Sequence, residues 1–461
     1  MDKLLSPKDI VRSGLCIGCG SCVARSHSPG AQMQFDPYGQ LKPAPARRWY
    51  QLRSEEFTNT CPFSPAAKNE DQLASQLFAA VQHETTVGYL QAAYVGHVEE
   101  DTYRAQGSSG GMVTWVATEL LRKGLIDGVA HVVASENPQA NGRFFHYRIA
   151  RTEAEIREGA KSRYYPVELS EIIRTIQAIP GRYAVVGIPC FIKAVQLLRM
   201  EDWVLKERIV FTLGLFCGHM KSARFVESFA WQMKVPFRQI QQVDFRYKDA
   251  GRPANWYNAM LQLNNGETVN KDWWHLADGD WGAGFFMNNA CNFCDDVVAE
   301  TADISFGDAW VEPYASDGKG TNVVVVRSPV IHQVLLDGIA GARLQLKEVD
   351  ASFVAQTQAA GLRQRREGLA YRLTWNHRGV KPLKRVAPDS TTPAKQRKWI
   401  YTMRYYISAW SHRIFRLARS IQQPRLYIAW SRLAGAVYHG LAYHKGKIGE
   451  MSKRFSQLKT R

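Results

Sequence analysis

Long apolar runs are missing from this sequence: no stretch approaches the roughly 18 consecutive apolar residues that a membrane-spanning helix needs. The first residues, MDKLLSPKDIVRSGLC, also lack the apolar run and the small-residue cleavage site of an export signal. We therefore expect a cytoplasmic protein. Cysteine is scarce, with 8 residues in 461, and in a reducing cytosol clustered cysteines are more often metal ligands or catalytic thiols than disulfides.

Acidic residues are almost absent from the end of the chain. Residues 381–461 contain 18 Lys and Arg but only Asp389 and Glu450, whereas residues 1–380 contain 41 basic and 40 acidic side chains. The net charge of +17 therefore belongs to a C-terminal segment, and the body is neutral. Because the body shows no recognisable nucleic-acid-binding motif, and basic helices alone bind polyanions indiscriminately, nucleic acid is an unfavoured partner.

The composition changes along the chain in a way that predicts several domains. Residues 1–70 are rich in Cys, Gly, Ser and Pro, which is typical of a small domain that a cofactor holds together. From about 90 to 350, β-branched runs alternate with helical periodicity, which predicts an α/β fold with a largely parallel or mixed sheet. Residues 365–395 are typical of a solvated linker. The predicted strands are 128–135, 183–187, 209–216, 302–308 and 322–328.

Three cysteines lie within seven residues, in the motif C-x2-C-x2-C. They are Cys16, Cys19 and Cys22, and a fourth, Cys61, is followed by proline. An iron–sulfur cube needs converging thiolates, and a tight loop with glycines between the cysteines supplies three of them. A structural zinc site is the alternative, although zinc more often takes paired knuckles. In two-cluster ferredoxins the cysteine before proline serves the other cluster, so the cluster that Cys61 serves stays open.

The other four cysteines are dispersed over a hundred residues. Cys190 and Cys217 follow predicted strands, where a parallel sheet presents its site-bearing loops, and Cys291 and Cys294 form a C-x2-C knuckle. Their spacing alone leaves both a second metal site and plain core packing open.

Five segments in this order give the sequence a resemblance to a known family: GLCIGCGSC, AQGSSGGMVTWVATELLRKGLIDG, VVGIPCFIKAVQLL, FCGH and CNFCDDVVAETADISFGDAW. Together they resemble the coenzyme F420-reducing hydrogenase beta subunit family, which also includes 7-hydroxymethyl chlorophyll a reductase and a ferredoxin-dependent divinyl chlorophyllide 8-vinyl reductase. The resemblance implies a ferredoxin-like module at 1–70, a flavin-binding domain at 88–175 and an iron–sulfur and flavin domain at 176–360. It does not cover the basic tail at 380–461.

The resemblance also implies the cofactors, since family members bind FAD and one or two [4Fe-4S] clusters. Cys190, Cys217, Cys291 and Cys294 would then hold the cluster nearest the flavin, with the N-terminal cysteines as an outer relay. The motif QGSSGGM is expected to bind phosphate at a helix start that Ser108 or Ser109 caps, although an ordinary glycine-rich cap would look similar. The candidate flavin-binding residues are Ser108, Ser109, Gly110, Gly111, Lys161, Ser162, Arg163, Tyr164, Asp308 and Trp310.

An iron–sulfur cluster passes one electron at a time, whereas a flavin can store two electrons and release a hydride. Clusters beside a flavin would therefore connect a one-electron donor to a two-electron acceptor. We expect an oxidoreductase that takes electrons from reduced ferredoxin or a similar donor and reduces an unknown organic substrate. The alternatives are an electron-transfer subunit that exchanges electrons with the deazaflavin coenzyme F420 for a larger complex, and a non-redox, zinc-stapled binding module. His219, just after Cys217, is a candidate proton source, and a hydrogen-bonded loop histidine is the alternative.

The tail has the pattern of basic amphipathic helices. Apolar residues recur every three or four positions, with arginines mostly on other faces. Such helices suit an anionic membrane surface, so 395–461 is a candidate for peripheral attachment to the inner membrane face, and packing on the body is the alternative. Some bacterial members of the family accompany cell-surface polysaccharide synthesis. The recurring residues are Trp399, Met403, Ile407, Trp410, Ile414 and Leu417.

Overall fold

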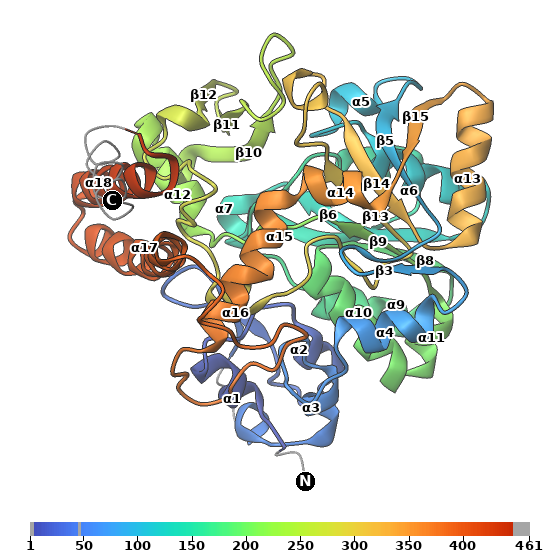
Figure 1. Ribbon diagram of the computed structural model, residues 1–461, viewed down its shortest axis with the longest axis horizontal. Coiled ribbons are helices and arrows are strands. Elements are labelled where there is room, and N and C mark those ends of the chain that lie inside the picture. The colour runs from blue at the N-terminus through green and yellow to red at the C-terminus, as the bar shows by residue number, and fades with distance from the viewer. Residues whose placement is uncertain (1–3, 45–47, 446–461) are drawn as a thin grey trace.

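The computed structural model describes residues 4–44 and 48–445, and its centre is a mixed sheet of eight strands in the order β15-β5-β14-β13-β9-β8-β6-β7 (Figure 1). Neighbouring strands from β13 through β9 and β8 to β6 run parallel, and the remaining pairs are antiparallel. This confirms the expected mixed α/β fold. The strands are β5 (Ala92–Val98), β6 (Gly128–Ala134), β7 (Phe145–Ala150), β8 (Tyr183–Gly187), β9 (Ile209–Leu215), β13 (Ile304–Asp308), β14 (Asn322–Val326) and β15 (Leu344–Val349).

Helices cover the sheet, and each helix buries its apolar stripe. Trp115 of α6 and Leu335 of α13 are fully buried in one hydrophobic cluster with Val324 and Val326 of β14. Ile173 of α9 and Val195 of α10 pack in another cluster, with Val185 of β8. The helices of this region are α5 (Tyr103–Gln106), α6 (Met112–Arg122), α7 (Pro138–Asn141), α8 (Glu153–Glu158), α9 (Ser170–Ala178), α10 (Pro189–Glu201), α11 (Trp203–Arg208) and α13 (Pro329–Ala340).

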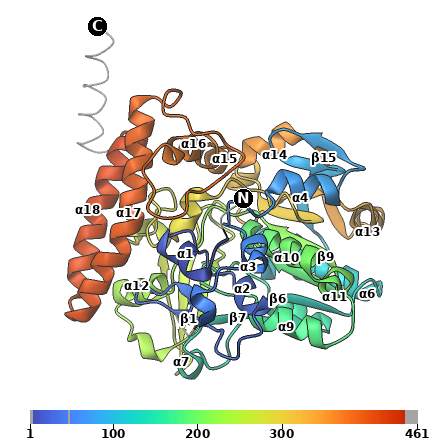
Figure 2. The ribbon, with the colours of Figure 1, turned by 90° about the horizontal axis from the view of Figure 1, so that it is seen from below.

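The N-terminal region forms a small unit against α9 and α10 (Figure 2). Ile10, Ile17 and Phe63 join the same hydrophobic cluster as the α9 and α10 side chains, so the unit shares a core with the large domain. Its elements are α1 (Pro7–Arg12), α2 (Ser21–Arg25), β1 (Met33–Phe35), β2 (Leu41–Pro43), η1 (Arg48–Gln51) and α3 (Glu55–Thr60), and α4 (Glu70–Leu77), β3 (Gln82–Glu84) and β4 (Gly88–Leu90) follow.

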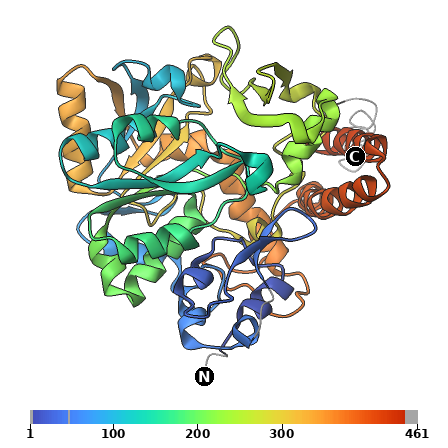
Figure 3. The ribbon, with the colours of Figure 1, turned by 180° about the vertical axis from the view of Figure 1, so that it is seen from behind.

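A second, three-stranded antiparallel sheet lies beside the large one (Figure 3). Its strands pack against α12 through an aromatic core in which Phe225, Phe229 and Trp273 are in mutual contact. The elements are α12 (Arg224–Met233), η2 (Phe237–Gln239), β10 (Ile240–Tyr247), β11 (Asn258–Leu263), β12 (Thr268–Asp272), η3 (Trp273–His275), η4 (Asn289–Phe293) and η5 (Tyr314–Ser316).

The prediction of a solvated linker is wrong for the first part of that segment. Residues 365–373 lie in α15 and α16, and Arg365 and Arg372 are only 4% and 3% exposed. Their guanidinium groups donate to carbonyl oxygens of distant loops, which a local reading of a basic run cannot reveal. The C-terminal helices are α14 (Ala351–Thr357), α15 (Ala359–Arg365), α16 (Glu367–Leu373), α17 (Lys395–Ser420) and α18 (Pro424–Tyr443).

Helices α17 and α18 form an antiparallel hairpin at one edge of the molecule (Figures 1 and 2). The predicted apolar stripe is divided, because Ile407 is buried against the body whereas Trp399 and Trp410 are 61% and 45% exposed. None of the described helices combines the length and the apolar character that crossing a bilayer requires.

Candidate functional site

The first group of cysteines is the outer set, defined as Cys16, Cys19, Cys22 and Cys61. Three of them lie on or beside the loop that leads into α2, and Cys61 directly follows α3. The loop curls because Gly18 and Gly20 have left-handed φ angles of 85° and 83°, which favour glycine. All four cysteines line one pocket, whose other walls include Ile10, Phe57 and Phe63. The fold thus brings the triplet and the separate cysteine together.

The chemistry of the outer set suits a metal cluster. Burial raises the pKa of the Cys19 thiol to about 11. Burial also raises the pKa of Cys22 well above its usual range, and the neighbouring charges of Cys19 and Cys16 raise it further. Four such thiolates would repel one another in an apolar pocket, and bound iron would compensate their charge.

The second group is the inner set, defined as Cys190, Cys217, Cys291 and Cys294. Cys190 lies in the first turn of α10 after β8, and Cys217 follows β9, so both lie beyond the carboxyl ends of neighbouring parallel strands. Cys291 lies in η4 and Cys294 directly follows it. The backbone N–H of Met220 donates to the Cys291 sulfur at 3.3 Å, which links the loop after β9 to η4.

The thiols of the inner set are close enough to act on one another electrostatically. Burial raises the pKa of Cys190 well above its ordinary value, and the charges of Cys294, Cys217 and Cys291 add to that increase. Among the described residues, no three His, Cys, Asp or Glu side chains are grouped tightly enough to hold a single metal ion. A cube binds each of its four sulfur ligands at a different iron corner, so its ligands lie farther apart than those of one ion.

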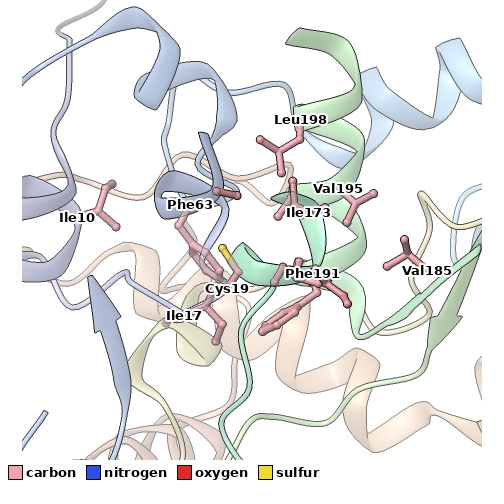
Figure 4. Close-up of a cluster of buried hydrophobic side chains, with 14 of the residues drawn as sticks. Ile10, Ile17, Cys19, Phe63, Ile173, Val185, Phe191, Val195 and Leu198 are labelled. Carbon is pink, nitrogen blue, oxygen red and sulfur yellow. The ribbon is translucent and has the colours of Figure 1, made fainter. Parts of the chain in front are cut away.

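The outer and inner sets are neighbours, because every cysteine of the two sets except Cys217 lies in or against one hydrophobic cluster. Cys19 is among the groups that raise the pKa of Cys190. Figure 4 shows Cys19 close to Phe63 and Phe191, and Phe191 follows Cys190 in the first turn of α10. A side chain also joins the sets, since the side-chain amide of Asn288 donates to the Ile17 carbonyl oxygen at 3.3 Å.

Buried cations from α15, α16 and the following segment surround the inner set. Arg365 donates to the carbonyl oxygens of Cys217, Gly218 and Cys294 at 2.9, 2.8 and 3.3 Å. Arg372 donates to the Asn292 carbonyl oxygen at 2.8 Å. Burial lowers the pKa of Arg365, but the thiolates of the inner set outweigh it and raise that pKa overall. The sequence analysis missed these residues, and the basic run RQRRE was the available signal.

The predicted phosphate loop precedes α6, as expected, but its capping is different. The N-cap residue is Gly111, with a left-handed φ of 85°, and neither Ser108 nor Ser109 caps the helix. The Met112 N–H instead donates to the Asn322 amide oxygen at 3.2 Å. The expected serine cap is therefore wrong, because a serine cap needs extended backbone at the capping position and the chain is left-handed there.

The glycines of this loop permit close backbone packing. A Cβ at Gly110 would lie 2.8 Å from the Gly96 carbonyl oxygen, and one at Gly111 would lie 2.6 Å from the Tyr103 backbone. Ser109 is buried and donates to the Thr321 carbonyl oxygen at 2.9 Å. These two glycines are explained by the fold itself, whether or not the loop binds a ligand.

Two of the predicted flavin-binding segments meet at this loop. The Ser162 N–H donates to the Ser108 hydroxyl at 2.7 Å. Lys161 has a left-handed φ of 95°, and its ammonium group lies 3.2 Å from the Asp244 carboxylate and 3.4 Å from the Arg246 carbonyl oxygen. The segment from 161 is thus held between the loop and β10.

Arg246 joins the remaining predicted residues to this region. Its guanidinium makes a bidentate ion pair with Asp308, at 2.9 and 3.1 Å, and lies over the rings of Tyr257 and Trp310. Its Nε is buried with no hydrogen-bond partner among the described residues. Lys248 donates to the carbonyl oxygens of Arg104, Ser109 and Lys319, at 2.5, 2.8 and 2.7 Å. Neither basic residue was predicted from the sequence, because Arg246 in β10 and Lys248 just after it lie in a segment without a recognisable motif.

Tyr164 and His219 meet through an aromatic residue that the sequence analysis did not select. Trp281 stacks on His219 with centroids 4.1 Å apart and contacts Tyr164 at 4.7 Å. Burial lowers the pKa of His219 well below its usual range, and the charges of Lys221 and Arg404 lower it further. The neutral imidazole is favoured at pH 7. Arg163 points elsewhere, over the Phe145 ring at 5.1 Å.

An open depression of about 790 Å³ adjoins the loop region. Lys248 and Asp249 line both this depression and a smaller pocket that reaches Ser108 and Arg246. The depression is also lined by Arg252, Lys271 and His275, so its wall is rich in basic side chains. A ligand in the depression would lie next to the predicted flavin-binding residues.

Two family models match consecutive parts of this chain. The model for the N-terminal part of the coenzyme F420 hydrogenase/dehydrogenase beta subunit matches residues 93–174, and the model for its C terminus matches residues 181–352. The chain belongs to this family. The matched region contains the inner set and the loop before α6, whereas the outer set, α15–α16 and the hairpin lie outside it.

Two known proteins are similar to this member of the family. The coenzyme F420-dependent sulfite reductase of Methanocaldococcus jannaschii is 22% identical over 315 residues, which are 65% of this chain and 43% of that protein. This chain therefore spans less than half the length of that curated relative. A chain in the F420-reducing [NiFe] hydrogenase complex of Methanosarcina barkeri is 16% identical, with a TM-score of 0.47, over 62% of this chain and 93% of that chain.

Proposed function

We propose that this protein is an iron–sulfur flavoprotein that exchanges electrons between a one-electron carrier and a deazaflavin of the coenzyme F420 type. Membership of the F420 hydrogenase/dehydrogenase beta subunit family supports the deazaflavin, and so does the similarity to an F420-dependent reductase. The observation that carries the proposal is the gathering of all eight cysteines into two adjacent sets of four. That arrangement fits two [4Fe-4S] clusters.

The chain's own residues have separable tasks in this proposal. The outer and inner sets hold the two clusters, and the apolar side chains around them exclude water. Lys161, Arg246 and the N-terminus of α6 provide positive charge for the pyrophosphate of FAD. When bound, the clusters supply single-electron transfer and the flavin supplies the change to two-electron chemistry.

Tyr164 and Trp281 provide a planar aromatic wall between this region and His219, two residues from Cys217. These residues would orient a flat ring system on the side that faces the inner set.

The first experiment is anaerobic purification followed by assay of iron, acid-labile sulfide and flavin. We expect about eight iron and eight sulfide per chain, with one FAD. Cys22→Ala and Cys294→Ala should each lose about half of the iron, and each variant serves as the control for the other. Zinc without sulfide or flavin would contradict the proposal and support the zinc-stapled binding module.

The second experiment tests the deazaflavin. Reduced protein mixed anaerobically with oxidised coenzyme F420 should bleach the deazaflavin absorbance, and Cys294→Ala should abolish that reaction. Loaded protein that leaves F420 unchanged would contradict the deazaflavin part and leave the cofactor assignment standing.

A ferredoxin-dependent reductase of an organic substrate is the second candidate. The outer set favours it, because this ferredoxin-like unit lies on the same chain and shares a hydrophobic core with the inner set. Under this candidate, reduced ferredoxin should reduce the bound flavin of the isolated protein without any added subunit. A one-electron carrier can also reduce the flavin under the first candidate, so the result that separates the two is reduction by reduced F420, which only the first candidate expects. Stopped-flow absorbance at the flavin band measures both reactions.

A further inference from the structure

The hairpin of α17 and α18 has a charge of one sign only. From Lys395 to Lys445 the chain carries ten Lys and Arg and no Asp or Glu. Two of these cations have evident structural roles, since Arg404 donates to the Gly282 carbonyl oxygen at 2.8 Å and Arg419 pairs with Glu227 at 2.8 Å. The others include three exposed arginines on the outer side of the hairpin, namely Arg413, Arg425 and Arg432, whereas the exposed Arg416 lies over the Tyr38 ring, 5.5 Å from its centroid.

The hairpin is a fixed part of the body. The Phe286 N–H donates to the Ser411 hydroxyl at 2.9 Å, and the Ser408 hydroxyl donates to the Met287 carbonyl oxygen at 2.9 Å. Phe415 and Tyr427 are fully buried in the aromatic core beside α12. One side of each helix is therefore used for packing, and the opposite side faces outward in a set orientation.

The outward side is unusually apolar for a surface. Of the twenty exposed large apolar side chains among the described residues, eight lie between Trp399 and Tyr443. On α17 the exposed positions 399, 406, 410, 413 and 417 advance by steps of three, four or seven, which places them on one face. The eight are Trp399, Tyr406, Trp410, Leu417, Ile421, Leu426, Leu433 and Tyr443, and we call them, with Arg413, Arg425 and Arg432, the outer hairpin face.

An arginine packs on an aromatic side chain of this face. The Arg413 guanidinium lies over the Trp410 ring, 5.3 Å from its centroid. Trp and Tyr prefer the headgroup depth of a bilayer, leucine side chains enter the acyl boundary, and arginine binds lipid phosphate. A face that combines all three types without one acidic residue has the chemistry of a peripheral membrane contact.

We propose that the outer hairpin face binds the surface of an anionic lipid bilayer and holds the redox protein beside it. The occupant follows from charge complementarity, since anionic headgroups match a surface that carries only positive charge. The proposal concerns this face alone and does not depend on which cofactor the cysteine sets bind.

The test is flotation of the full-length protein with lipid vesicles. Wild-type protein should float with vesicles of phosphatidylglycerol and phosphatidylcholine, should bind phosphatidylcholine vesicles much less, and should be released as salt is raised. Arg413→Glu, Arg425→Glu and Arg432→Glu in one chain should lower the partition coefficient at least about ten-fold. Trp399→Ala, Trp410→Ala and Leu433→Ala together should also weaken binding, and their binding should become more salt-sensitive.

The matched controls lie on other surfaces. Lys206, Arg238 and Lys347 are exposed outside the hairpin, so their combined change to Glu alters the net charge by the same amount. Trp203 and Leu383 are each 70% exposed, and Trp203→Ala with Leu383→Ala removes apolar surface elsewhere. Both controls should float as the wild type does, and equal melting temperatures show that every variant is folded.

Two results would overturn the proposal. If the hairpin variants and the surface controls lose binding equally, attraction by net charge explains the flotation and the outer hairpin face has no special role. If wild-type protein stays at the bottom of the gradient with every vesicle, the face does not bind lipid, and an acidic protein surface becomes its expected partner.

Discussion

Arg365 binds the backbone of Cys217 directly: its Nη2 donates to the Cys217 carbonyl oxygen at 2.9 Å, and its Nη1 donates to the Cys294 carbonyl oxygen at 3.3 Å. One buried guanidinium therefore joins the two loops that carry three of the four inner cysteines. It also places a positive charge beside sulfurs whose own charges are repulsive.

We predict that Arg365→Gln destabilises the protein by about 3 kcal/mol, because buried carbonyl oxygens lose charge-assisted hydrogen bonds. In the loaded protein it should also lower the reduction potential of the inner cluster, since removing a nearby cation disfavours the added electron. Chemical denaturation and potentiometric titration by electron paramagnetic resonance measure the two effects.

Arg363→Gln, at an exposed position of the same helix, should change stability by less than about 0.5 kcal/mol. An unchanged potential in Arg365→Gln would show a purely structural role.

Much of the sheet could be predicted because buried central strands have a local signature, whether their neighbours are parallel or antiparallel. NVVVV in β14 is buried at every position, and YAVVG in β8 is buried at all positions but one. Their continuous β-branched runs therefore identified both strands in the sequence. The edge strand β15 has only one buried residue, Leu344, and its exposed residues include Lys and Glu, so it was not among the predicted strands. A half-exposed edge strand lacks the continuous hydrophobic run that identifies a central one.

The outer set could be anticipated from its motif and the inner set from the family resemblance, whereas the groups around them could not. Arg365 contacts backbone atoms more than 70 residues away along the chain, and Trp281 reaches both Tyr164 and His219. Such contacts depend on tertiary packing, and a basic run has the same composition whether it faces water or a buried carbonyl oxygen. The prediction of one continuous apolar face on α17 was wrong for a related reason. Helical periodicity identifies which residues share a face, but it does not show whether the protein body or solvent covers that face.

Acid should destabilise the fold through buried histidines. Burial first, and then the charge of Arg148, lowers the pKa of His131 to about 4, against 6.5 for a free histidine. Between these two pH values the unfolded chain binds a proton that the folded chain does not, so the free energy of unfolding falls as the pH falls. His131 alone should cost about 3 kcal/mol between pH 6.5 and 4.

The variant His131→Leu should flatten this pH dependence, which urea titrations at half-unit pH steps would show. His275→Leu, at a side chain that is 73% exposed, is the control. A slope that is the same in wild type and His131→Leu would contradict the role of His131 and point to other buried groups.

The ion pair between Lys193 and Glu70 should be costly to break from one side. The two charged atoms are 3.1 Å apart, and each side chain is only 5% exposed. Lys193→Met leaves a buried carboxylate unpaired and should destabilise the protein by about 3–5 kcal/mol. The double variant Lys193→Met with Glu70→Met should recover much of that loss. A double-mutant cycle by denaturation measures the coupling, with exposed Lys206→Met as the control. If the double variant is as unstable as the sum of both single variants, the pair is not coupled.

Lys248 should control how well the loop before α6 binds flavin. Its ammonium group donates to the carbonyl oxygens of Arg104, Ser109 and Lys319. One cation therefore links the loop before α6 to the segments that contain Arg104 and Lys319. Lys248→Met removes three charge-assisted hydrogen bonds and should raise the dissociation constant for FAD at least about ten-fold. Lys347→Met, at an exposed position of β15, is the matched control, and fluorescence titration of the deflavinated protein measures both. If Lys248→Met lowers the melting temperature but binds FAD as the wild type does, the residue stabilises the loop without shaping a flavin site. If it loses FAD at an unchanged melting temperature, the loop is part of that site, because only the bound state then depends on the lysine.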